Sequence, residues 1–131
     1  MWEKQMRERC PQSKKVGIAR LPGYRWIISI HGYANVVKSE DDEVEGDLYM
    51  ISDSDENSLD RWEGVHSGSY RKATLRVASP QGEEEVLVYV DPVTEEGNPK
   101  QEYINRINSG LADAKLSPKY VIRYVRNFIP A

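Results

Sequence analysis

The apolar residues of this chain follow a strand period in its N-terminal part and a helix period toward its C-terminus. Four segments rich in β-branched and aromatic residues, or alternating with charge, predict strands: residues 24–30, 44–51, 70–78 and 84–90. Pro22-Gly23 should introduce the first of them, because both residues interrupt regular structure. The Ser79-Pro80-Gln81-Gly82 sequence is typical of a turn, so the last two strands should form a hairpin.

Helix start signals mark three further elements. Asn98 and Pro99 suit the N-cap and first residue of one helix, and Ser117-Pro118 suits the start of another. A short helix is expected over residues 55–62, with Ser52 or Ser54 as its cap and Gly64 as its stop. Apolar stripes follow the two later starts, and they are more typical of core than of a cofactor site: Tyr103, Ile104, Ile107 and Leu111, then Tyr120, Val121, Tyr124, Val125 and Phe128. Strands first and helices last predict the α+β class, with a mostly antiparallel sheet that is open or curled toward a barrel.

Size and composition exclude several classes of protein. A chain of 131 residues suits a single domain over residues 1–131. It carries 21 acidic against 18 basic residues and no long basic stripe, which argues against nucleic acid as a partner. No apolar run approaches the ~18 residues of a membrane span. The N-terminus is polar, unlike a secretory signal, and one cysteine, Cys10, fits a reducing, cytoplasmic location. With His31 and His66 it makes no zinc pattern, and we expect no metal or other cofactor.

Charge is segregated along the chain. Residues 1–25 hold seven basic and two acidic residues, whereas residues 39–60 hold ten acidic residues and no basic one. Two solvated surfaces that attract each other explain this pattern. A calcium loop starting at Asp53 would explain the acidic segment differently. However, Ser58 stands where the turn glycine belongs and Gly64 where the bidentate glutamate belongs, so that reading is excluded.

Glu63 is the strongest candidate for chemistry. Leu59 and Trp62 give the expected short helix an apolar face, and Glu63 follows at its C-terminus. The negative end of the helix dipole, together with burial beside Trp62, would raise the pKa of this carboxyl and improve it as a general base. A solvated glutamate at a frayed helix end is the alternative that the residues leave open.

Other reactive residue types lack a supporting motif. The sequence holds no Gly-x-Ser-x-Gly elbow, phosphate loop or dinucleotide fingerprint. Cys10 has no histidine near it in sequence, and Ser67-Gly68-Ser69 reads as a turn. The segment His31-Gly32-Tyr33-Ala34-Asn35 is either an ordinary loop or part of a cleft wall.

Several stretches, taken in order, resemble the γ-glutamylcyclotransferase family with its AIG2-like fold. The matching stretches are Gly46-Asp47-Leu48-Tyr49 (the family's Gly-x-Leu-Tyr strand), Leu59-Asp60-Arg61-Trp62-Glu63-Gly64 with Tyr70 (its Leu-Asp-x-x-Glu-Gly motif and following Tyr), Val88-Tyr89-Val90, and the two C-terminal helices at residues 103–112 and 116–120. The resemblance implies a mixed, mostly antiparallel, barrel-like sheet with flanking helices and a pocket at one end. It also implies release of an amine from a γ-glutamyl substrate as 5-oxoproline forms, chemistry that belongs to glutathione metabolism.

The resemblance also assigns roles to residues. Glu63 matches the catalytic acid/base, and Tyr70, Tyr89 and Tyr103 match aromatic pocket residues that contact substrate. Tyr70 and Tyr89 alternate in strands, so ordinary cross-strand packing is an alternative role for both. The substrate brings its own nucleophile, an α-amine that closes a five-membered ring on the γ-carbonyl. One carboxyl that takes a proton and then gives one back would therefore suffice.

One departure from the family is large. Its Tyr-Gly-Ser-Asn-Leu loop, whose backbone N–H groups hold the substrate, has no counterpart in this sequence, and Met1 stands where the last Leu of that loop would be. We therefore expect a domain truncated at its N-terminus. Such a chain could be inactive, could pair the exposed sheet edge with a second copy as a homodimer, or could bind a small ligand or a partner without turnover.

Overall fold

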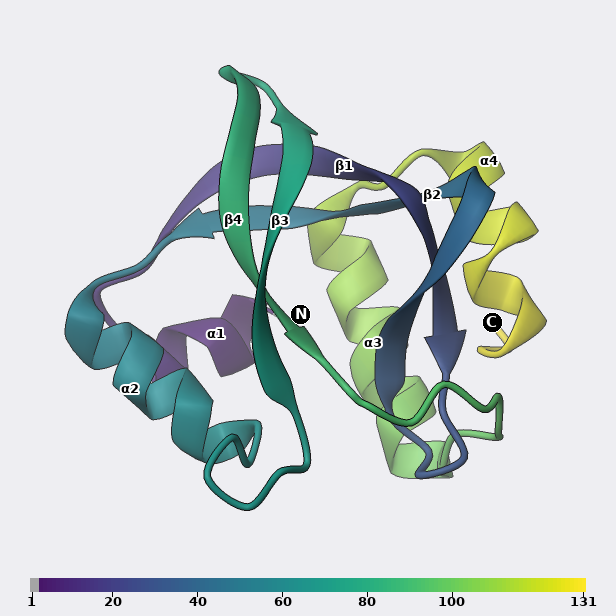
Figure 1. Cartoon of the computed structure of the whole chain (residues 1–131). Helices are drawn as coiled ribbons and strands as arrows, with labels where there is room; N and C mark the ends of the chain where they lie inside the picture. Colours follow the sequence, from purple (N-terminus) through teal and green to yellow (C-terminus); the bar gives the residue numbers. More distant parts are fainter. Residues whose placement is uncertain (1–2) are drawn as a thin grey trace.

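The computed structural model describes residues 3–131, which form one antiparallel sheet flanked by helices (Figure 1). In chain order the elements are α1 (Glu3–Arg9), β1 (Lys14–Ile28), β2 (Ala34–Met50), α2 (Asp53–Trp62), β3 (Arg71–Ser79), β4 (Gly82–Val90), α3 (Gln101–Ala114), α4 (Pro118–Arg123) and the short 3-10 helix η1 (Val125–Asn127). The strand order is β2-β1-β3-β4, and the ladders within it are antiparallel. The predicted α+β class with a mostly antiparallel sheet is confirmed.

The ribbon of β1 and β2 is much longer than predicted and changes direction midway (Figure 1). Pro22 and Gly23 lie inside β1, not before it, so the predicted strand start was wrong. The ladder is interrupted there, because Pro22 pairs with Glu43 while Tyr24 pairs with Lys38. Proline cannot donate to a ladder, and Gly23 adopts a φ of +79° that favours glycine, so both residues suit an irregularity better than a regular strand.

The hairpin of β3 and β4 forms as predicted. Ser79 pairs with Gly82 across the two-residue turn Pro80-Gln81. Within the described chain the hairpin joins β1 in register at the Arg20–Ala78 pair. The sheet is therefore built of two ribbons that meet near the middle of β1.

The predicted N-caps of α2 and α4 are found in the structure, and in both helices a side chain caps the first turn. Ser52 caps α2, with the Ser52 hydroxyl accepting from the Asp55 N–H and the Asp55 carboxylate accepting from the Ser52 N–H. Ser117 caps α4 as expected. The early helix α1 was not predicted, because its sequence shows no apolar stripe and buries only Met6.

The predicted start of α3 at Asn98 and Pro99 is wrong, since the helix begins at Gln101 after Lys100. The preceding segment is held in extended form against the end of β1. The Gly97 N–H bonds to the Ile28 carbonyl, and the Ile30 N–H bonds to the Glu95 carbonyl. These long-range backbone hydrogen bonds outweigh the local helix start signal.

Three apolar clusters hold the elements together. The two C-terminal helical stripes pack as predicted into the largest one, around Ile28, Tyr120, Val125 and Ile129. A second joins Met6 and Cys10 to Leu59 of α2, and a third fills the crossing of the two ribbons. The segregated charges meet where Lys15 pairs with Asp47 at 3.6 Å. No helix among residues 3–131 has the length and apolar character needed to cross a membrane.

The cap of α2 leads to a prediction about stability. Replacement of Ser52 by Ala removes the hydroxyl that accepts from Asp55 and should lower the free energy of unfolding by about 1 kcal/mol. Urea unfolding followed by circular dichroism measures this difference. Asn57→Ala, at an exposed position within the same helix, is the control and should not destabilise the protein. An equal loss in both variants would contradict the capping role.

Candidate functional site

A cavity of about 1000 Å³ lies between the β1–β2 ribbon, α3 and the segment after α2. Glu63, Tyr70, Tyr89 and Tyr103, the four site residues predicted from the sequence, all line it. Glu63 directly follows α2 and Tyr70 directly precedes β3, whereas Tyr89 lies near the end of β4 and Tyr103 in the first turn of α3. The fold thus brings together residues that lie as much as 40 positions apart in the chain.

Glu63 is fixed at the point where α2 ends. It is the C-cap residue, and its backbone N–H donates to the Leu59 carbonyl at 2.8 Å. Gly64 then turns the chain with a φ of +65°, a conformation that strains any residue with a side chain. A Cβ at Gly64 would also lie 3.0 Å from the Ser69 Cβ. The Glu-Gly pair of the motif is therefore explained by the turn that aims Glu63 at the cavity.

Burial raises the pKa of the Glu63 carboxyl above its ordinary value of 4.5, while the nearby guanidinium groups of Arg9 and Arg106 act in the opposite direction. Burial was one of the two causes predicted, together with the helix dipole, but Trp62, the neighbour expected to bury Glu63, is itself 62% exposed. The prediction of an apolar face on α2 is confirmed for Leu59, which is buried, but not for Trp62, which is exposed. The Arg9 guanidinium carbon lies 4.3 Å from the centroid of the Trp62 ring.

Tyr70 and Tyr103 bond to the two backbone polar groups of one residue, Ala34. The Tyr70 hydroxyl donates to the Ala34 carbonyl at 2.6 Å, so its proton is already used. The Tyr103 hydroxyl accepts from the Ala34 N–H at 3.1 Å and keeps its own proton for a further partner. Burial raises the pKa of both phenols, so both stay protonated at neutral pH. Tyr103 can therefore donate to a ligand, whereas Tyr70 can only accept.

The hydroxyl of Tyr89 is bound by another part of the protein, whereas its ring lines the cavity. The hydroxyl donates to Asp60 at 2.6 Å, and the second carboxylate oxygen of Asp60 pairs with Lys72 at 3.2 Å. Asp60 thereby ties α2 to both strands of the hairpin. Sequence reasoning assigned no role to this motif residue, since its two partners lie 12 and 29 positions away.

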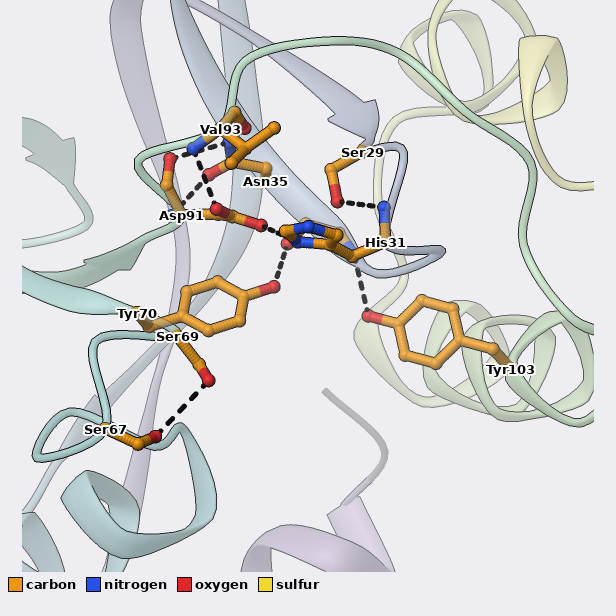
Figure 2. Close-up of polar contacts among 10 residues, drawn as sticks. Ser29, His31, Asn35, Ser67, Ser69, Tyr70, Asp91, Val93 and Tyr103 are labelled. Carbon is orange, nitrogen blue, oxygen red and sulfur yellow. Dashed lines mark hydrogen bonds and ion pairs between the residues drawn. The ribbon is translucent and has the colours of Figure 1, made fainter.

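A polar cluster on the cavity wall centres on Asp91, which is 3% exposed (Figure 2). One carboxylate oxygen of Asp91 lies 3.4 Å from Nδ1 of His31, and the other accepts from the Val93 N–H. The Asn35 side chain braces the backbone of Asp91 and Val93. The alternative in which the segment around His31 lines a cleft is confirmed for His31, Tyr33 and Ala34.

Sequence reasoning missed Asp91, Arg9 and Arg106 as cavity residues. The position of Asp91 directly after the predicted strand 84–90 could have marked it as a cavity residue. Cys10 is buried, and burial raises the pKa of its thiol, so it remains protonated and unreactive. Across residues 3–131, no three His, Cys, Asp or Glu side chains gather closely enough to hold a metal ion.

Comparison with known proteins gives consistent matches. A sequence model of the AIG2-like family matches residues 43–123. Over 53 residues the chain is 42% identical to the Homo sapiens protein "Gamma-glutamylcyclotransferase", an alignment that covers 40% of this chain and 28% of that protein. The chain thus matches little more than a quarter of this curated relative's length.

Solved structures resemble the fold over nearly the whole chain. An uncharacterized Homo sapiens protein superimposes with a TM-score of 0.85 at 26% identity, covering 99% of this chain and 83% of that one. A structure titled "Gamma-glutamyl cyclotransferase" does so with a TM-score of 0.84 at 25% identity, covering 98% and 82%. The chain therefore has the γ-glutamylcyclotransferase fold.

The raised pKa of Glu63 makes stability depend on pH. A carboxyl whose pKa is higher in the folded state favours folding at low pH, and this contribution is lost as pH rises through the folded-state pKa. The Glu63→Gln variant should therefore be more stable than the wild type at pH 7, with the difference shrinking toward pH 4. Unfolding free energies of both proteins across this range measure the effect. A difference that does not depend on pH would contradict the raised pKa.

Proposed function

Since the chain belongs to the AIG2-like family, we propose that it acts as a γ-glutamylcyclotransferase-like enzyme with Glu63 as general acid/base. The observation that carries this proposal is a partly buried carboxyl of raised pKa on the wall of a cavity large enough for a dipeptide. A carboxyl whose pKa is moved toward neutrality can both accept and donate a proton at working pH.

The reaction needs little from the protein beyond folding the substrate and moving a proton. The α-amine of the substrate attacks its own γ-carbonyl carbon, a new C–N bond closes the five-membered ring, and the bond to the leaving nitrogen breaks. Glu63 takes a proton from the attacking nitrogen and returns one to the leaving nitrogen, so no net proton is consumed. Proximity within the folded substrate supplies much of the rate enhancement.

The tyrosines would divide the remaining tasks. Tyr103 has a hydroxyl proton to donate, and so can bind a substrate oxygen, the reacting carbonyl included. Tyr70 offers only lone pairs and suits a substrate N–H or ammonium group. Tyr89 contributes a ring face to the wall, because its hydroxyl is engaged by Asp60.

A binding module without turnover is the second candidate. It is favoured by one observation, that the guanidinium groups of Arg9 and Arg106 oppose the rise in the pKa of Glu63 on which general acid/base catalysis depends. Such a protein would hold a small γ-glutamyl compound in the same cavity and leave it unchanged.

Release of 5-oxoproline from γ-glutamyl dipeptides and γ-glutamyl amines tests the first candidate. The wild type should release 5-oxoproline, and Glu63→Gln, which keeps the shape and removes the titrating proton, should lose at least a hundredfold in kcat. Circular dichroism establishes that both proteins are folded. A folded wild type that binds these compounds without turnover would instead support the binding module.

The assignment of Tyr103 as a donor leads to its own prediction. Tyr103→Phe removes the hydroxyl whose proton is available to a ligand and should lower kcat/KM by about ten- to a hundredfold. Tyr89→Phe is the matched control, because its hydroxyl does not face substrate, and it should change stability more than kcat. Equal losses of kcat/KM in the two variants would contradict the donor role.

A further inference from the structure

Two guanidinium groups share the wall of the cavity with Glu63. Arg9 closes α1 and Arg106 lies in α3, so the fold brings together residues 97 positions apart. The Arg9 guanidinium stacks over the Trp62 ring at 4.3 Å, and that of Arg106 lies 5.3 Å from the Tyr103 ring centroid. Both arginines are close enough to Glu63 to influence its ionisation. Stacking on an aromatic face fixes a guanidinium while leaving its N–H edge free for a partner.

Within residues 3–131, neither arginine side chain forms an ion pair or a hydrogen bond with a protein group, although the charge of Glu63 acts on both. The buried Nε of Arg106 has no hydrogen-bond partner. The other cavity carboxylates are engaged elsewhere. Glu45 accepts from the Ser117 N–H, Asp47 pairs with Lys15, and Asp91 contacts His31. An unpartnered buried N–H of this kind is costly unless a ligand satisfies it.

The two arginines also repel each other: burial lowers the pKa of the Arg9 guanidinium, the charge of Arg106 lowers it further, and Glu63 acts in the opposite direction. Such an arrangement is unfavourable in the free protein, and an anion placed between the two guanidinium groups relieves it. A carboxylate suits their geometry, since its two oxygens can accept a pair of parallel N–H bonds.

We propose that Arg9 and Arg106 form a carboxylate-binding subsite beside Glu63, which selects γ-glutamyl compounds by their carboxylate. The inference rests on the proposed function and narrows its substrate class. A γ-glutamyl amino acid carries two candidate carboxylates, one on its glutamyl end and one on its leaving group. Each is attached to the carbon next to a nitrogen that exchanges a proton with Glu63, so either fits the same subsite.

Three small molecules separate these two sources. γ-Glutamyl-alanine has both carboxylates, γ-glutamyl-ethylamine lacks the leaving-group carboxylate, and 4-aminobutyryl-alanine lacks the glutamyl one. Calorimetry measures the Kd of each in the Glu63→Gln background, which prevents turnover. The compound lacking the contacted carboxylate should bind about tenfold or more weakly than γ-glutamyl-alanine.

Arginine variants in the same background identify the subsite. Arg9→Gln and Arg106→Gln should each remove most of that discrimination, whereas Arg9→Lys and Arg106→Lys should retain part of it, because charge remains but the fork is lost. Arg61→Gln, an exposed arginine outside the cavity wall, is the control and should leave every Kd unchanged. Thermal unfolding establishes that each variant is folded.

The outcomes distinguish the subsite from the proposed activity. Discrimination in the Glu63→Gln protein that disappears in the arginine variants establishes the subsite, even if the wild type releases no 5-oxoproline and the proposed enzyme fails. Equal binding of the three compounds, unchanged discrimination in folded arginine variants, or no binding of any compound would overturn the subsite, whether or not the wild type turns substrate over.

Discussion

The interruption of the β1–β2 ladder at Pro22 and Gly23 is the constraint on which the cavity depends. Residues 39–42 leave the ladder opposite this point, and the ribbon changes direction there (Figure 1). Its two halves then serve different neighbours. Tyr49 of β2 packs with the cluster that holds α1 and α2, whereas Trp26 of β1 packs with α3 and α4. The cavity is lined by both halves, with Gly46 and Asp47 from one and Trp26 and Ala34 from the other. A straight ribbon would not face both groups of helices.

The position of Glu63 follows from the rigidity of the helix that carries it. The Ser52–Asp55 capping box fixes the start of α2, and Asp60 ties its last turn to Tyr89 and Lys72. Leu59 buries the inner face against Met6 and Cys10. Burying a carboxyl is unfavourable, and it persists because these contacts leave the end of the helix little freedom to turn Glu63 outward. The same interactions that stabilise the fold therefore maintain a carboxyl of raised pKa.

Local signals in the sequence predicted the elements that local interactions decide. The turn at Pro80-Gln81 and the cap Ser117 need only neighbouring residues, and the sequence predicted both, whereas for α2 it left Ser52 and Ser54 as alternative caps. The start of α3 depends on backbone bonds from Gly97 to Ile28, which no local pattern encodes. The candidate site shows the same division. The motif identified Glu63 as a candidate, but the sequence attributed its burial to Trp62, which is exposed. The arginines beside Glu63 come from α1 and α3, and only the tertiary fold places them there.

The charge balance around Glu63 links binding to catalysis. In the free protein, burial raises the pKa of this carboxyl while Arg9 and Arg106 oppose that rise. A substrate carboxylate bound between the two guanidinium groups would neutralise the opposing charge and exclude water from the same wall. Both effects move the pKa of Glu63 further upward, toward the range in which a carboxyl exchanges protons with an amine near neutral pH. The subsite would then do more than hold the substrate, since a γ-glutamyl compound that occupies it would adjust the acid/base group that acts on it.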